Sequence, residues 1–252
     1  QTFLPRPQPG QPRVPGGFPM PGGYTLGGLM LVNLLAAHAL RFKFTWERSG
    51  ILLIHAGLVL LIVGELVTSV SQVESRMVLH EGSSSNYSED IRRVELAVID
   101  PSSLDHDSVA VISHKRLAQG GTIRHPRLPF DIRIDDFFAN SGILGPRQAG
   151  ARPRATAGSG VGLTAVPQAP FSGTEAQSVD LPSAYVTLSA GGRTLGTYLL
   201  SLVSLARPMP AIDQPQEVVV DGRTYYIHLR FVRYYKPFTL HLIDFSHDRY
   251  LG

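Results

Sequence analysis

The sequence predicts a membrane protein with two parts: a transmembrane helical hairpin, followed by an extracytoplasmic all-β domain of the antiparallel β-sandwich or open-barrel type. Two apolar segments near the start, residues 24–40 and 51–70, predict the hairpin. Beyond them, short alternating runs bounded by turn residues predict strands. The expected domains are a proline-rich extracytoplasmic connector (1–23), the hairpin (24–72) and the β domain (73–252).

The orientation of the hairpin follows from its charges. The second apolar segment is long enough to cross a hydrocarbon core of about 30 Å, and the first is just long enough. The short loop between them carries Arg41, Lys43 and Arg48, whereas the preceding connector carries only Arg6 and Arg13. Because basic loops stay on the cytoplasmic side, the loop is expected inside and the β domain outside. A chain that starts outside is expected to continue upstream with at least one more helix, and its last residues also look truncated.

Composition narrows the function classes. The 43% hydrophobic and 17% charged content fits an apolar hairpin averaged with a polar domain. The net charge of +3 is small, and no basic cluster alternates with aromatic residues, so nucleic acid is not an expected partner. Since the sequence has no cysteine, disulfide exchange, a cysteine-zinc site and thioether attachment of haem to this chain are excluded.

The β domain shows two hairpin patterns and one clear alternating strand. Residues 185–200 fold back at Gly191-Gly192, and residues 217–235 fold back at Asp221-Gly222, a pair that suits the positive φ angles of a type I′ turn. Pro237 interrupts the strand that follows. Phe130, Ile132 and Ile134 alternate and are expected to face a core.

A segment inside the β domain departs from this pattern. Residues 140–182 are rich in Gly, Ala, Pro, Ser and Thr and have few large apolar side chains. Such a stretch buries too little surface to offset the entropy of ordering it. We therefore expect a flexible insertion between two strands.

Each apolar segment of the hairpin contains one histidine, His38 and His55. Ionisable side chains inside a membrane are costly and mark a functional site by default. Neutral imidazole is a common ligand of metals and haem iron. Two structural alternatives stay open: His55 hydrogen-bonds a neighbouring helix, and His38, one turn from Arg41, reaches interfacial water. His55 faces almost opposite to a stripe of small residues at Gly50, Gly57 and Gly64, so it would point away from this chain if that stripe packs within it.

The soluble part offers no catalytic pattern. Its seven histidines have no metal or catalytic spacing, and the sequence has no phosphate-binding loop, serine elbow or paired carboxylates. These histidines are expected to be structural or exposed: His80, His106, His114, His125, His228, His241 and His247.

Three blocks of sequence resemble the ResB-like (ResB/CcsB-type) proteins of cytochrome c biogenesis, which belong to the System II haem-delivery pathway. The blocks are residues 48–58 (RSGILLIHAGL) with 64–68 (GELVT), residues 81–90 (EGSSSNYSED) and residues 235–252. Members of that family look like four-helix membrane proteins with a large extracytoplasmic β domain between helices three and four. By that resemblance, this chain would hold helices two and three and the domain.

The resemblance implies a multi-pass protein of the bacterial inner membrane that helps to carry haem across the bilayer and present it to apocytochrome c. The implied partners are a ResC/CcsA-type tryptophan-rich protein, separate or fused, and extracytoplasmic thiol reductant proteins. The implied cofactor is haem b, held transiently and without a covalent bond. His55 lies in the helix-three match and would ligate haem iron, with His38 as the second candidate. Trp46 is the only tryptophan, so a cytochrome c synthetase-type activity would belong to the complex, and no catalytic residue is assigned here.

Two other functions stay open. One is a membrane-anchored β domain that acts as an assembly scaffold without haem. The other is a haem-binding electron-transfer subunit, which would need two axial ligands within one chain, such as His38 with His55.

Overall fold

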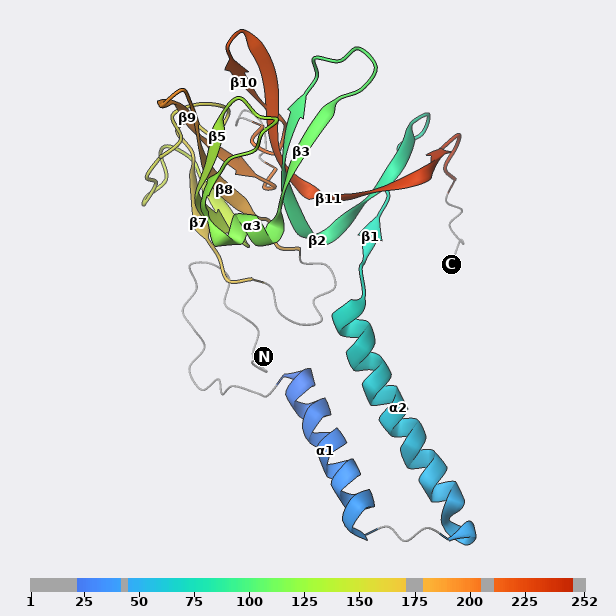
Figure 1. The fold of residues 1–252 in the computed structure, drawn as a ribbon. Coiled ribbons are helices and arrows are strands. Elements are labelled where there is room, and N and C mark those ends of the chain that lie inside the picture. Colours follow the sequence, from blue (N-terminus) through green and yellow to red (C-terminus); the bar gives the residue numbers. More distant parts are fainter. Residues whose placement is uncertain (1–21, 42–44, 171–178, 205–210, 247–252) are drawn as a thin grey trace, which may run out of the picture. The chain divides into compact units, whose positions relative to one another are not determined.

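The computed structural model describes residues 22–41, 45–170, 179–204 and 211–246 (Figure 1). The chain divides into two compact units, residues 1–73 and 74–252. Most of the predicted connector lies outside the described residues.

The first unit contains two long apolar helices, as predicted. Helix α1 spans Gly23–Arg41 and α2 spans Ser49–Ser71, with a short 3-10 turn, η1, at Trp46–Arg48. Helix α2 ends at Ser71. The next residue, Gln72, has an extended backbone, and its N–H donates to the carbonyl of Thr68. Both helices are long and apolar enough to cross a membrane, and most of their apolar side chains are exposed.

The second unit is an antiparallel β domain, as predicted. One sheet has the order β1-β2-β11-β10, with β3 also paired to β2; a second has the order β4-β5-β8-β9; and β6 pairs with β7. A short helix, α3 (His114–Gln119), follows β3. The strands are β1 Ser75–Arg76, β2 Ser84–Asp100, β3 Ser108–Ser113, β4 Gly121–Ile123, β5 Asp131–Phe138, β6 Ser141–Leu144, β7 Thr164–Pro167, β8 Ser183–Ala190, β9 Arg193–Ser201, β10 Gln216–Val220 and β11 Arg223–His241.

Both predicted hairpins form. Strands β8 and β9 join at Gly191-Gly192, and β10 and β11 join at Asp221-Gly222. Asp221 and Gly222 have φ angles of 49° and 76°, which is the left-handed backbone that a two-residue hairpin turn needs.

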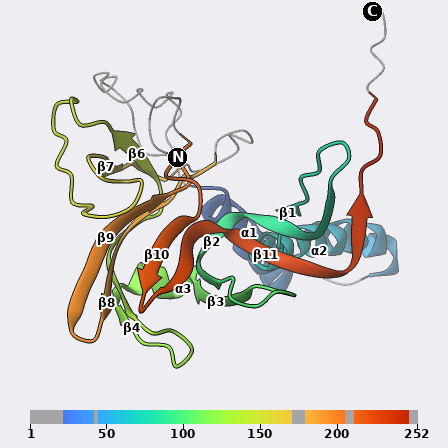
Figure 2. The same cartoon turned by 90° about the horizontal axis from the view of Figure 1, so that it is seen from above.

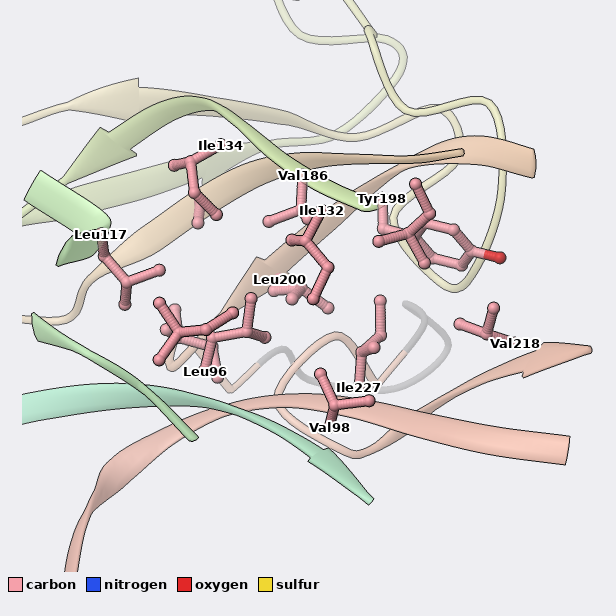
Figure 3. Close-up of a cluster of buried hydrophobic side chains, with 14 of the residues drawn as sticks. Leu96, Val98, Leu117, Ile132, Ile134, Val186, Tyr198, Leu200, Val218 and Ile227 are labelled. Carbon is pink, nitrogen blue, oxygen red and sulfur yellow. The ribbon is translucent and has the colours of Figure 1, made fainter. Parts of the chain in front are cut away.

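The core lies between the two larger sheets (Figure 3). Phe130, Ile132 and Ile134 are buried there, as their alternation predicted. Leu96 of β2 and Ile227 of β11 meet them from the other sheet. Burying one such side chain stabilises a fold by about 1.5–3 kcal/mol, so this double layer supplies the domain with a core of its own.

Strands β2 and β11 form a long two-stranded ladder that continues beyond the core (Figure 2). Its regular pairing stops at Tyr235, opposite Tyr87, and resumes at Leu240, opposite Ser85. Pro237 lies in this break, because proline has no N–H to contribute to the ladder. The predicted interruption is therefore confirmed at this position.

The segment over residues 140–182, predicted as a flexible insertion, contains two short strands and buried residues, while the rest of its described part lies outside helices and strands. It contains β6 and β7, and it buries Leu163 and Ala165 against Tyr185 and Leu199 in a second apolar cluster. In part of this segment the small residues mark close packing. Gly160, for example, lies so close to Leu199 that a β-carbon would sit 2.5 Å from the β-carbon of Leu199. Residues 171–178 lie outside the described part.

Candidate functional site

His38 and His55 lie side by side. Their ring centroids are 4.7 Å apart and their planes meet at 75°, an edge-to-face contact. His38 lies three residues before the end of α1 and His55 six residues after the start of α2, so the pair sits near the loop end of both helices. The sequence offered two separate candidates, and the structure joins them in one site.

The faces of the helices explain this contact. On each helix, half-buried residues recur at helical spacing, and both histidines belong to these stripes. Gly50, Gly57 and Gly64 lie on an exposed face, with nothing within 4 Å of a β-carbon added at any of them. The glycine stripe is therefore not the face that packs within this chain, and His55 points towards α1. The two half-buried stripes are Gly27, Leu31, Leu34 and His38 on α1, and Leu52, His55, Val59 and Ile62 on α2.

The backbone of its own helix orients His38. Its Nδ1 lies 3.0 Å from the carbonyl oxygen of Leu34. A carbonyl only accepts hydrogen bonds, so Nδ1 carries the proton and, in the neutral ring, Nε2 carries the lone pair. Histidines that bind metals commonly have this arrangement, with the other ring N–H donated to a carbonyl.

His55 has a different environment. Its Nδ1 is buried and has no hydrogen-bond partner within the described part of the chain. A buried polar atom without a partner costs about 1–3 kcal/mol. The hydrogen bond to a neighbouring helix that the sequence left open for His55 is therefore not made by Nδ1 within the described residues.

The spacing of the two rings suits one axial haem ligand from this chain better than two. With metal–nitrogen bonds of about 2 Å, two imidazoles on opposite sides of one iron would have ring centroids about 6 Å apart. The observed 4.7 Å leaves no room for an iron between the rings. Among the described residues, no group of three or more His, Cys, Asp or Glu side chains comes together, so the chain builds no closed zinc-type site there either.

The described histidines of the β domain are dispersed, as predicted. Nε2 of His228 lies 3.1 Å from the carbonyl of Asp213, and burial lowers the pKa of His228 below its usual 6.5. His114 packs edge to face on Phe137, and burial together with the nearby Arg93 lowers its pKa. These are structural contacts; His247 lies outside the described residues.

Sequence reasoning missed a buried carboxylate in the β domain. One oxygen of Asp90 accepts the backbone N–H groups of Arg92 and Arg93, and the other accepts Nε of Arg93 and the hydroxyl of Tyr234. Burial raises the pKa of Asp90, but these hydrogen bonds outweigh burial and the net shift is downward. An aspartate commonly accepts the backbone N–H groups two and three residues after it. This local pattern could have predicted the turn at Asp90.

Comparisons with known proteins add no family. No family model matches the chain, and no curated protein matches it. The functional assignment therefore depends on the three sequence blocks and on the histidine pair.

Proposed function

We propose that this chain is a membrane component of a System II cytochrome c maturation complex, which helps to carry haem b across the membrane and present it to apocytochrome c. The observation that carries the proposal is the contact between His38 and His55, which joins two long, predominantly apolar helices. Intramembrane histidines are costly to insert, and a haem-binding role explains why each helix carries one.

Each residue of the site has a stated role. His55 presents a buried imidazole nitrogen that has no other described partner. His38, held through Nδ1 by the carbonyl of Leu34, packs against the His55 ring and restricts its orientation. The apolar helices exclude water from the site. Bound haem would supply the iron that accepts an imidazole nitrogen, and the second axial position would belong to a ResC/CcsA-type partner.

A single ligand from this chain suits transient binding. A carrier must release its cargo, and one histidine from each of two proteins is easier to give up than two from a single chain. The 4.7 Å contact also argues against the electron-transfer alternative, which needs both axial ligands in this chain.

The proposed location is the bacterial inner membrane, with the basic loop in the cytoplasm and the β-sandwich outside. Under the positive-inside rule, the histidine pair then lies towards the cytoplasmic side, where haem enters. The β domain would face apocytochrome c and the thiol reductant proteins.

The test uses the full-length protein, produced with its partner in a bacterium that lacks its own maturation system. His55→Ala should lower both the haem that co-purifies and the amount of mature cytochrome c. Added imidazole, which is small enough to enter the space left by the side chain, should restore part of both. Leu61→Ala, an exposed position on the same helix, is the control and should change neither. Full haem content and full maturation in His55→Ala would favour the scaffold alternative.

A further inference from the structure

The part of the β2–β11 ladder that continues beyond the core is a two-stranded ribbon (Figure 2). We call it the ribbon arm: residues 84–89 of β2 with residues 233–241 of β11. In this arm Tyr235 pairs with Tyr87, and Leu240 pairs with Ser85. Residues paired across an antiparallel ladder share a face, and so do residues two apart along one strand. These four side chains therefore lie on the same face of the ribbon arm.

This first face is aromatic and apolar. The rings of Tyr87 and Tyr235 lie 5.7 Å apart, and the guanidinium of Arg233 lies 4.2 Å from the centre of the Tyr87 ring. The charge of Arg233 is paired, because its Nε donates to Glu89 at 3.0 Å. Tyr235 is 61% exposed and Leu240 is 48% exposed, so the aromatic face is open to its surroundings.

The opposite face of the ribbon arm is polar. It carries the exposed side chains of Ser84, Asn86 and His241. Ser84 and His241 are hydrogen-bonded to each other, with Oγ and Nδ1 2.8 Å apart. The ribbon arm is therefore amphipathic, like a surface strand that has lost the layer its apolar face should cover.

More apolar side chains are exposed along the same stretch of chain. Phe238 lies in the break of the ladder, and Ile243 and Phe245 follow the end of β11. All three are exposed, as Tyr235 and Leu240 are. A cluster of exposed large apolar residues marks an interaction surface.

We propose that the aromatic face of the ribbon arm lies on the surface of the membrane that holds the hairpin. The rings of Tyr87 and Tyr235 and the side chain of Leu240 would then occupy the boundary between lipid headgroups and acyl chains. A tyrosine ring has an apolar body and a polar tip, and tyrosine is enriched at this boundary. The inference takes only the membrane location of the hairpin from the proposed function and does not depend on haem.

The connection between α2 and β1 favours lipid over a protein partner. Only residues 72–74 separate the two elements, and an extended connection of this length spans at most about 14 Å. Strand β1 pairs with Glu89 and Asp90 of β2, at the base of the ribbon arm. A helix that crosses a bilayer ends at its surface, so the covalent chain keeps the base of the ribbon arm close to lipid.

The size of the aromatic face favours the same occupant. Two strands of six residues present a face of about 20 Å by about 10 Å, or about 200 Å². A stable protein–protein interface needs about 800 Å² from each partner. A two-stranded ribbon is also only marginally stable in water, and lipid against its apolar face would stabilise it.

The experiment uses this chain in lipid nanodiscs that hold one copy each. Since the sequence has no cysteine, one introduced cysteine carries the only fluorescent label. The variants are Leu240→Cys on the aromatic face and Asn86→Cys on the polar face. Leu104→Cys, in the loop at the other end of β2, is the matched control because Leu104 is also exposed and apolar. Leu60→Cys, at an exposed position of α2, reports insertion of the hairpin. Spin-labelled lipids quench from the bilayer, and iodide quenches from water.

The label on Leu240→Cys should be quenched by the spin-labelled lipids, and it should lose most of the iodide quenching that the label on Leu104→Cys shows. The label on Asn86→Cys should stay open to iodide. Tyr235→Cys gives a second position on the aromatic face and should behave as Leu240→Cys does. A local disturbance at one position therefore does not decide the result.

The inference fails if iodide quenches the labels at Leu240 and Tyr235 as strongly as the label at Leu104, because the aromatic face is then free for a protein partner. It also fails if protection from iodide appears only in discs with two copies, since the face would then join two copies of this chain. Leu60→Cys distinguishes the two proposals. If lipid does not quench the label at Leu60, the membrane location itself is wrong; if lipid quenches that label alone, only the docking of the ribbon arm is rejected.

Discussion

The helical hairpin and the β domain differ in how their buried ionisable groups are paired. In the described part of the domain, the buried charges are all paired: Arg230 donates to Glu95 at 2.9 Å, and Asp90 accepts four hydrogen bonds. In the hairpin, the buried Nδ1 of His55 has no hydrogen-bond partner among the described residues. Paired groups stabilise a fold, whereas a buried imidazole nitrogen without a hydrogen bond is costly to keep. The paired groups stabilise the domain, and the nitrogen of His55 is the one to which the proposed function assigns the ligand.

The two regions also differ in where their apolar side chains lie. In the domain they fill a core between two sheets, with Ile132, Val186 and Ile227 fully buried. In the hairpin most of them are exposed, as Leu53 and Leu60 are. Exposed leucines on long helices suit a lipid environment, whereas the domain buries its apolar side chains in a core of its own.

The first prediction has an all-or-none outcome and concerns the side of the membrane on which each region lies. A reporter protein fused after Gly82 should be active only when it is outside the cytoplasm, and one fused at Thr45 should behave as cytoplasmic. The positive-inside rule is the physical reason. Paired fusions that work on either side, such as a phosphatase and a fluorescent protein, provide the measurement. The opposite pattern would reverse the orientation and remove the basis for haem entering near the loop.

The second prediction concerns the buried ion pair of the domain. Arg230→Met leaves Glu95 charged, buried and alone, which should lower the free energy of unfolding by about 3–5 kcal/mol. The double variant Arg230→Met with Glu95→Leu should recover most of that loss. Arg124→Met removes an exposed partner of Asp131 and should cost about 0–1 kcal/mol. Denaturant titration followed by circular dichroism measures all three; equal effects of the two single substitutions would contradict a stabilising role for the buried pair.

The third prediction tests whether the segment over residues 140–170 is part of the fold. Leu163 is buried against Tyr185 and Leu199, so Leu163→Ala should destabilise the domain by about 2–5 kcal/mol. Val161, two residues earlier, is exposed, and Val161→Ala should have almost no effect. Thermal unfolding of the two variants checks this. If the Leu163→Ala and Val161→Ala variants are equally stable, the flexible loop predicted from composition is the better description.

The fourth prediction has the smallest expected effect and concerns a buried histidine of the domain. Burial lowers the pKa of His228 below 6.5, so the unfolded chain takes up this proton more readily than the folded one. Stability should therefore be unaffected by this group above about pH 6.5 and fall as the pH drops below it. His228→Phe should flatten this part of the curve, while His125→Phe, at an exposed position, should not. Denaturant titrations at about pH 7.5 and about pH 5.5 give the slope, and an unchanged slope in His228→Phe would refute the assignment.

Much of this fold could be predicted from local patterns. The apolar segments gave both helices, Asp221-Gly222 gave a hairpin, and the alternation around Ile132 gave a buried strand. Pairings between distant strands could not be predicted, because nothing local to β2 indicates that it pairs with β11. The packed part of residues 140–170 could not be predicted, because glycine and alanine can indicate either mobility or close packing. Only the neighbours of Gly160 decide which of the two applies.

The candidate site could be predicted only in part. Their positions within two apolar segments singled out His38 and His55 as separate residues. Their contact depends on which face of α2 packs on α1, and the glycine stripe pointed to the wrong face. The hydrogen bond from His38 to Leu34 depends on a rotamer that spacing does not determine.

The most direct test of the division between the regions is the spectrum of haem bound by the full-length protein after histidines are replaced region by region. Replacing both His38 and His55 with phenylalanine should abolish the histidine-ligated spectrum. Replacing each histidine after residue 73 with glutamine, one at a time, should leave that spectrum unchanged. If the hairpin variant keeps the histidine-ligated spectrum and one of the domain variants loses it, haem binds outside the membrane and the hairpin is only an anchor.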